Sequence, residues 1–324
     1  MALRQKTVVG DITNSDYFGE IAAQGDTVKI IKEPEISVSA LARGTQVQAQ
    51  DLVDTDFSLT IDKANYYAFK IDDIEEAHSH VNFMDLATNR AAYRLADQHD
   101  QEVLGYLAGY KQTTLHTKAD AVNTTVNGTK AVTTAGSDEL LASMKLNKGS
   151  FTNITTSSAG DHAIPVAARL PGATALPTAY VSPVMMINRM SRLLDTQNVD
   201  KDGRWIVIDP VLLEVLADED SRFLNQDAGN GLMLNRIGSF RVYVSNNLPA
   251  LGTGAATAGT ANQNTNFGVL VAGHDSAVAT AEQINKTESY RDVDSFADIV
   301  RGMHLYGRKI LRPEALVTAK YNLA

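Results

Sequence analysis

The stretch "FSLTIDKANYYAFKI", residues 57–71, decides the fold because its side chains alternate in the manner of one very long β-strand. Apolar residues fall at the odd positions, apart from Lys63 and Asn65, while Ser, Thr, Asp and Lys fall at even positions. At roughly 3.3 Å per residue this strand would be about 50 Å long, whereas strands of globular proteins usually have about 3–10 residues. The pattern therefore predicts a strand that is too long for a compact body.

The residues before this strand predict an extended arm. "DTVKII", residues 26–31, has the character of a second strand, and residues 33–56 between the two contain one proline and one glycine. A structureless loop of that length is uncommon within a compact domain. We therefore interpret the whole region as a long two-stranded arm with its tip near residues 42–45.

The residues after the strand predict a long helix. Residues 72–104 contain neither Gly nor Pro, and Asp72 or Asp73 can cap the start of the helix. Continued to Tyr110, the helix would be nearly 60 Å long at about 1.5 Å per residue. Its apolar stripe follows steps of three and four residues and consists of Ile74, Ala77, Val81, Met84, Thr88, Ala91 and Leu95.

The remaining segments predict a mixed α+β protein. Residues 111–178 are rich in Thr, Ala, Asn and Gly, which suggests an insertion or surface subdomain with one short helix at 137–146. The segments after it alternate in type: helices are expected at 182–194, 209–219 and 275–284, and strands at 204–208 (with Trp205 as a core anchor), within 238–249, at 267–273 and within 295–322.

Composition excludes several classes of protein. The chain of 324 residues has no cysteine, which excludes disulfides, thiolate nucleophiles and Cys-ligated metals. With 38 acidic and 29 basic residues its net charge is −9, and it has no basic run for gripping nucleic acid. Neither a signal peptide nor an apolar run of membrane-spanning length is evident, so we expect a soluble, cytoplasmic protein without membrane contact.

The search for catalytic motifs centres on Asp209. It ends the apolar strand in "RWIVIDP", as the metal-holding aspartate of a Walker B element would. Such an element needs a G-x-x-x-x-G-K-[ST] loop, which is missing, whereas Pro210 after Asp209 predicts a helix N-cap. His78 and His80 are two residues apart and do not share a helix face, and neither H-E-x-x-H nor G-x-S-x-G occurs. We expect no catalysis, no cofactor and no metal site.

The arm itself points to assembly. Ordering its backbone costs roughly 1–2 kcal/mol per residue, and a two-stranded ribbon cannot bury enough apolar surface against itself to offset that cost. The missing surface must come from other subunits. A long arm, a long helix and no catalytic motif together describe an assembly protein.

The sequence resembles a known family, the HK97-fold major capsid proteins of tailed bacteriophages. The resemblance covers most of the chain apart from roughly 111–178. It is carried by a series of short strings in a fixed order: "GDTVKI", "FSLTIDKANYYAFKIDDIEEA", "RAAYRLADQHDQEVL", "GRWIVIDPVLLEVL" with "RFLNQD", "GSFRVYVSNNLP" and "YGRKILRPEALV". Each string is weak alone, and their order gives the resemblance its specificity.

The resemblance implies an α+β, HK97-like capsid fold with named parts. These would be an N-terminal arm (1–25), an extended two-stranded E-loop (26–71), a peripheral (P) domain with a long spine helix (72–110 and 285–312), an insertion or surface subdomain (111–178), and an axial (A) domain (179–284 and 313–324). Some members of the family cross-link through a lysine on the E-loop, and residues 33–62 contain no lysine, so we expect this covalent link to be absent here.

The resemblance also implies a function without catalysis. Subunits would self-assemble as hexamers and pentamers into the icosahedral head of the virion, after synthesis in the host cytoplasm. The implied partners are a separate scaffolding protein, since no coiled segment precedes residue 26, a portal, cement proteins, and packaged double-stranded DNA in loose contact with an acidic shell. Two alternatives stay open: an encapsulin-type shell of a cellular nanocompartment, and a nucleotide-dependent α/β enzyme based on "RWIVID".

Four residues are candidate contacts between subunits. Arg43 is the only basic residue between Lys32 and Lys63, and with Gly44 beside it near the arm's tip it is a candidate for an intersubunit ion pair. The other two are aromatic residues of the long strand, Tyr66 and Phe69.

Overall fold

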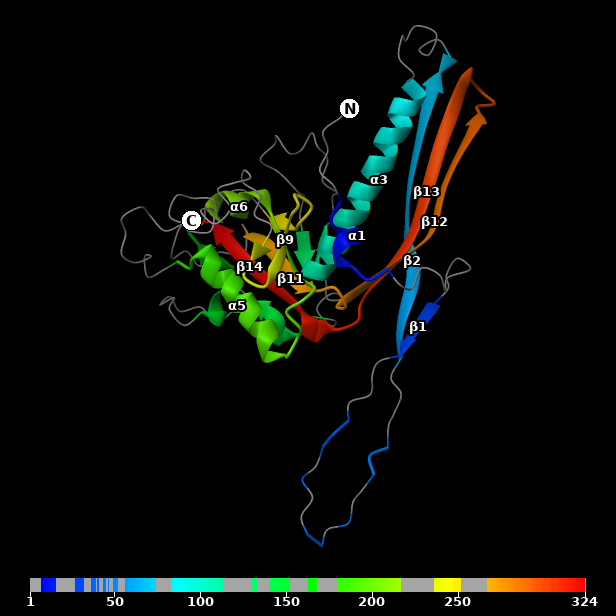
Figure 1. Cartoon of the computed structure of the whole chain (residues 1–324). Coiled ribbons are helices and arrows are strands. Elements are labelled where there is room, and N and C mark those ends of the chain that lie inside the picture. Colours follow the sequence, from blue (N-terminus) through cyan, green and yellow to red (C-terminus); the bar gives the residue numbers. More distant parts are fainter. Residues whose placement is uncertain are drawn as a thin grey trace.

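The structure, a computed structural model, describes residues 7–15, 27–31, 36–38, 40, 43–44, 46, 49–51, 56–73, 83–112, 130–132, 140–151, 163–167, 180–216, 236–251 and 267–323. These residues form a mixed α+β molecule in which a long sheet and a long helix extend beside one compact body (Figure 1). Within the described part, no helix is long and apolar enough to cross a membrane.

The body is built on an eight-stranded sheet in the order β5-β14-β11-β7-β9-β8, with β6 attached at β14 and β10 at β11. The bounds of its strands are β5 Lys145–Leu146, β6 Ile164–Val166, β7 Arg204–Ile208, β8 Arg236–Ile237, β9 Phe240–Val244, β10 Ala250–Leu251, β11 Phe267–His274 and β14 Leu316–Leu323. The helices of the body are α5 Pro183–Thr196 and α6 Pro210–Leu216. The structure confirms the helix predicted at 182–194 and the strands predicted at 204–208, within 238–249 and at 267–273. It also confirms the helix predicted at 209–219 as far as Leu216, and residues 217–219 lie outside the described residues.

The core of the body surrounds β7. Every residue of β7 is buried, which is typical of a central strand covered on both faces. Trp205 is fully buried, as predicted, and α5 directs Met186, Ile187, Met190 and Leu194 into the same core. Pro183 occupies the first turn of α5, where its missing N–H needs no partner.

The second sheet has four strands in the order β1-β2-β13-β12. Their bounds are β1 Thr27–Ile31, β2 Asp56–Asp72, β12 Val278–Arg291 and β13 Ala297–Ile310. The alternation that opened the sequence analysis is confirmed in β2, where Leu59, Ile61, Asn65 and Ile71 are buried and the even positions are exposed.

The length of β2 is explained by its pairing with two other strands, and not by a free two-stranded arm. Only Asp56–Thr60 pair with β1, whereas the residues from Ile61 to Asp72 pair with β13, antiparallel. The second half of the predicted ribbon is therefore part of a four-stranded sheet. The strand is long because β12 and β13 are also long, with 14 residues each.

Helix α3, Phe83–Ala108, runs along this sheet and enters the body with its C-terminal end (Figure 1). Residues 74–82 of the predicted helix lie outside the described residues. In the predicted stripe, Met84, Thr88 and Ala91 are only half-buried, and Leu95 is buried. The deepest burial lies further on, at Val103, Leu104 and Leu107, because only that end of the helix is covered by the body.

Two predicted helices are wrong. The segment 275–284 is a turn followed by the start of β12, because its small apolar residues pair with β13 and tertiary packing overrides their helical preference. In 137–146, the described residues form only a 3-10 turn, η3 Ala142–Met144, followed by β5. The remaining short elements are α1 Val9–Ile12, β3 Tyr110–Gln112, β4 Lys130–Val132, η4 Lys148–Ser150 and η6 Pro313–Ala315.

Candidate functional site

The arm exposes its tip. Arg43 and Gly44 form a turn within the predicted tip, and both are exposed. Gly44 has a φ of +94°, a conformation that favours glycine. Farther up the arm, the backbone N–H and the hydroxyl of Ser37 both donate to Oε1 of Gln50 at 2.9 Å, which links the two sides of the arm.

Apolar side chains flank this link without cover. Ile36 is 68% exposed and Val38 is 96% exposed. An arm that presents such residues to water has surface to bury against another molecule.

Tyr66 and Phe69 lie on opposite faces of the second sheet, because successive side chains of a strand alternate. Tyr66 is 78% exposed on the outer face, directly opposite Met303 of β13. Phe69 lies on the inner face, half-buried, with its ring stacked on that of Tyr67 at 6.1 Å. The structure therefore does not bring the two predicted contact residues together.

The outer face around Tyr66 combines apolar and charged side chains. Arg301 of β13 pairs with Glu288 of β12 at 2.9 Å and lies over the ring of Tyr290 at 5.1 Å. Lys286 pairs with the same carboxylate at 2.5 Å. Exposed pairs of this kind stabilise a fold by at most about 1 kcal/mol, so they organise the surface more than they hold the sheet together.

The far end of the sheet presents two large apolar residues on a turn that is held by hydrogen bonds. Val293 is 96% exposed and Phe296 is 81% exposed, in the turn between β12 and β13. Asp292 holds this turn: it accepts hydrogen bonds from Lys70 Nζ at 2.7 Å and from Ser295 Oγ at 2.6 Å. The hydrogen bond from Lys70 is the main cause that holds the pKa of Asp292 well below its ordinary value.

A second clamp fixes the same end. Arg291 binds the carboxylate of Asp73 and, at 3.3 Å, that of Asp298, while the Asp73 N–H donates to the carbonyl of Phe296 at 3.1 Å. A turn that is tied down yet exposes Val293 and Phe296 is typical of a docking surface. Sequence reasoning missed it, although an apolar pair in the polar stretch "RDVDSFAD" was a usable signal.

Asp100 joins three distant segments at the base of α3. Its Oδ1 accepts from the N–H groups of Val8 and Val9, both at 2.9 Å. Its Oδ2 accepts from Asn247 Nδ2 at 3.0 Å and from Ser245 Oγ at 3.4 Å. Burial raises the pKa of Asp100, while these hydrogen bonds favour the carboxylate. The residue fastens the N-terminal segment to the helix and to the body.

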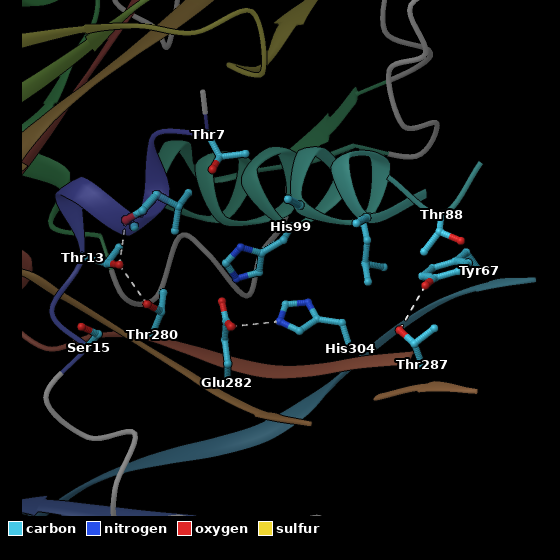
Figure 2. A pocket seen from close by; sticks show the side chains of 15 residues that line it. Thr7, Thr13, Ser15, Tyr67, Thr88, His99, Thr280, Glu282, Thr287 and His304 are labelled. Atoms are coloured by element: carbon cyan, nitrogen blue, oxygen red, sulfur yellow. Dashed lines mark hydrogen bonds and ion pairs between the residues drawn. The ribbon is translucent and has the colours of Figure 1, made fainter. Parts of the chain in front are cut away.

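A cleft of about 480 Å³ opens between α1, α3 and the second sheet (Figure 2). His99 of α3 and His304 of β13 both point into it, with ring centroids 5.3 Å apart. His304 Nε2 lies 3.4 Å from Oε2 of Glu282 on β12. His99 Nε2 and His304 Nδ1 are buried and have no hydrogen-bond partner among the described residues.

Charged groups in the cleft, and Glu102 one helical turn from His99, have shifted pKa values. Burial lowers the pKa of His99 to about 4, and the nearby His304 and Arg308 add to that effect, whereas Glu282 opposes it. The hydrogen bond from His304 lowers the pKa of Glu282. Burial raises the pKa of Glu102, whose carboxylate accepts from the hydroxyl of Tyr306.

Asp209 has the structural role predicted for it. Its Oδ1 accepts from the N–H of Leu212 at 3.0 Å, and its carbonyl accepts from Leu213, so it caps α6. His78 and His80 lie outside the described residues. Among the residues that the structure places, no group of three or more His, Asp or Glu is arranged to hold a metal ion.

Comparison with solved structures identifies the fold. A chain of Mycobacterium phage Che8 matches 98% of this chain and 94% of its own, with a TM-score of 0.63 and 23% identity. A chain from the capsid structure of Cyanophage P-SCSP1u matches 100% of this chain and 90% of its own, with a TM-score of 0.63 and 18% identity. A chain from the capsid of Ralstonia phage GP4 matches 96% of this chain and 86% of its own, with a TM-score of 0.63 and 11% identity.

No protein-family model and no curated protein sequence matches the chain. The likeness is therefore one of fold, at identities below a quarter, and it extends over nearly the whole of each chain. The chain has the α+β fold of phage capsid chains, as its resemblance to the HK97-fold proteins implied.

Proposed function

We propose that this chain is the major capsid protein of a tailed bacteriophage and has a structural role without catalysis. The observation that carries the proposal is the match of the whole chain, at a TM-score of 0.63, to chains of phage capsids. A match of this extent includes the long sheet, the long helix and the body together. An enzyme that shared only the body would not need the other two.

The exposed surfaces support an assembling subunit. The arm presents Ile36 and Val38, and the end of the sheet presents Val293 and Phe296, all more than half exposed. Apolar groups on extended parts of a molecule bury little in the free subunit and much between subunits. In the shell, the arm would lie against the spine helix and P domain of a neighbour, with Arg43 in an intersubunit ion pair.

The proposal extends to the assembly and the partners that the family resemblance implies. Hexamers and pentamers would build an icosahedral head in the virion, assembled in the host cytoplasm with a separate scaffolding protein, a portal and cement proteins. A net charge of −9 suits a shell that touches packaged double-stranded DNA without gripping it.

The two alternatives are less well supported. An encapsulin-type compartment would have the same fold, but the similar chains reported above come from phages. The hypothesis of a nucleotide-dependent α/β enzyme required Asp209 to hold a metal ion. In the structure the Asp209 carboxylate caps α6 instead.

Electron microscopy of the purified protein tests the proposal. The protein would be expressed alone and together with a candidate scaffolding protein from the same genome. Closed icosahedral shells made of hexamers and pentamers are the expected result in at least one preparation. A folded protein that stays monomeric in both preparations would contradict the proposal, and an enclosed cargo enzyme in place of DNA would favour the encapsulin alternative.

Phe296→Ser sharpens this experiment. The side chain is 81% exposed, so its loss leaves the folding of the free subunit nearly unchanged. Shells of the variant should be fewer or absent at protein concentrations where the parent chain assembles. Equal assembly would remove the end of the sheet from the proposed contact surfaces.

A further inference from the structure

The cleft between α1, α3 and the second sheet has the size and the lining of a small-molecule site. Its volume of about 480 Å³ lies within the range of pockets that bind small organic ligands, roughly 300–1,000 Å³. Small apolar side chains of α3 form one wall, and they are Ala92, Leu95 and Ala96. Hydroxyl groups line much of the rest, among them those of Thr13, Thr88 and Thr280 (Figure 2). The cleft therefore offers an apolar wall together with many hydrogen-bonding groups.

Three ionisable side chains meet in this cleft. Figure 2 shows the carboxylate of Glu282 between the imidazole rings of His99 and His304. The two histidines are only 8% and 6% exposed, yet His99 Nε2 and His304 Nδ1 have no hydrogen-bond partner among the described residues. Buried nitrogen atoms without partners are uncommon in folded proteins, and a group bound in the cleft would account for them.

These side chains favour a cation over an anion. The hydrogen bond from His304 lowers the pKa of Glu282, so the carboxylate is charged at neutral pH, and its side chain is 44% exposed within the cleft. Burial lowers the pKa of His99 to about 4, so its ring is uncharged at neutral pH. In a neutral His304, Nε2 carries the proton directed at Glu282, which leaves Nδ1 as an acceptor. The cleft thus presents a negative charge and an acceptor nitrogen.

An organic ammonium group suits these acceptors better than a metal ion does. Among the residues that the structure places, no three His, Asp or Glu side chains are arranged to hold a metal ion. An ammonium group needs only hydrogen-bond acceptors, and its N–H groups can be accepted by the Glu282 carboxylate, His304 Nδ1 and a threonine hydroxyl. Arg308, a protein cation near His99, is engaged by the carbonyl of Glu102 and the ring of Tyr106.

We propose that the cleft binds an aliphatic primary ammonium group, with its charge at Glu282 and its methylene chain along the apolar wall of α3. Such a group has two sources: a free aliphatic amine, or the lysine side chain of a second copy of this chain. The second source rests on the proposed function, because neighbouring copies meet in a shell. The site itself is a property of the free subunit.

Calorimetric titration of the free, unassembled full chain with butylammonium chloride at neutral pH tests the site. A dissociation constant on the order of 1 mM is expected for so small a ligand. Butan-1-ol has the same carbon chain without the charge and should bind about tenfold more weakly, while sodium chloride at equal ionic strength controls for screening. The NMR signals of the His99 and His304 rings should shift with butylammonium, which places the probe in the cleft.

Two variants and a matched control sharpen the test. Glu282→Gln removes the charge and should weaken butylammonium binding about tenfold. Ala96→Leu adds bulk to the apolar wall and should weaken binding without any change in charge. Glu288→Gln is the control, because it makes the same change in charge on the same strand, where the carboxylate pairs with Lys286 and Arg301 on the outer face. Its affinity should equal that of the parent chain.

Equal affinities for butylammonium and butan-1-ol would overturn the proposal, and this comparison needs no variant. Equal weakening in Glu282→Gln and Glu288→Gln, or ring signals that do not shift, would overturn it as well. These measurements use the free chain, so a failure of the site and a failure of the proposed function are separate outcomes.

Purified particles then distinguish the two sources of the ammonium group. An aliphatic amine extracted from particles would identify a free amine as the ligand. Treatment with a carbodiimide, which takes up the water released as an amide forms, can couple Glu282 to a lysine. Coupling that occurs in particles and not in free subunits would identify the lysine side chain of a neighbouring copy.

Discussion

At the scale of single residues, the carboxylates that could suggest a functional site have structural roles. Asp209 caps α6, and Asp100 gathers two backbone N–H groups and two side chains at the base of α3. Both carboxylates are enclosed by donors that they need for stability. Each carboxylate positions the elements to which it is hydrogen-bonded.

Replacing Asp209 should affect stability and no chemical step. Asp209→Asn should keep the free energy of unfolding within a few tenths of a kcal/mol, because asparagine caps about as well as aspartate. Asp209→Ala should lower it by about 1 kcal/mol. Denaturant titration of the three proteins measures both effects. ATP hydrolysis that the purified chain performs and Asp209→Asn abolishes would contradict the structural role.

Asp100→Ala should be the more damaging change. It leaves the N–H groups of Val8 and Val9 buried without an acceptor, at a cost of about 1–3 kcal/mol for each lost partner. Asp100→Asn keeps one acceptor oxygen and should cost less. Chemical unfolding of both variants gives the comparison, and equal losses would mean that the two N–H groups contribute little.

The contribution of Asp100 to stability depends on pH. Its folded pKa is raised above the ordinary 3.8, so its share of the stability is fully present below that value and is lost as the pH rises through the folded pKa. A series of unfolding curves should show this decline in the parent chain and not in Asp100→Asn. No difference between their pH profiles would argue against a raised pKa.

At the scale of elements, the backbones of β13 and β2 approach each other closely at Gly307. A Cβ on Gly307 would lie 2.5 Å from the carbonyl oxygen of Thr60, which belongs to the backbone of β2 and cannot rotate away. The register between β13 and β2 shifts at the same place, between Tyr306 and Gly307. Glycine here lets β2 continue from its pairing with β1 into its pairing with β13.

Gly307→Ala should therefore lower the free energy of unfolding by about 1–3 kcal/mol, as overpacked sites do. Gly10→Ala in α1 is the matched control, because a Cβ there meets nothing within 4 Å. Thermal unfolding of both proteins measures the difference. If the two variants melt alike, the sheet accommodates the methyl group at this point.

At the scale of the whole molecule, the structure separates a stable body from surfaces without cover. The body has a continuous core around β7 and β11, whereas the arm and the end of the sheet present large apolar residues to water. Under the proposed function, those residues find their cover in neighbouring subunits. The arm then changes its environment on assembly more than any part of the body does.

Limited proteolysis of the arm should report this change. Cleavage within residues 33–56 should be fast in free subunits and strongly suppressed in particles, because assembly covers the backbone that a protease must reach. Arg43→Glu should leave the folding of the subunit intact and impair assembly, since it reverses the only positive charge between Lys32 and Lys63. The loss per contact is about 1 kcal/mol or less, but it recurs at every equivalent contact of a shell.

Equal cleavage rates in subunits and particles would rule out the arm as an assembly element. Assembly of Arg43→Glu at the parent level would remove this residue from the predicted contacts. Gly44, Tyr66 and Phe69 stay predictions as contacts, and Phe69 is the least accessible of the side chains because it is half-buried on the inner face.

The sequence by itself determined the elements whose signal is local. The alternation of β2, the Pro-marked starts of α5 and α6 and the continuous apolar run of β7 are each contained in a few neighbouring residues, and all were predictable. The tertiary structure decided what depends on distant partners. It placed 278–284, where a helix was predicted, in a strand beside β13, and it moved half of β2 from a free ribbon into a sheet. It also brought His99 to His304, and it left Val293 and Phe296 exposed. The physical reason is that pairing and burial are settled by residues remote in the chain, so no local period carries them.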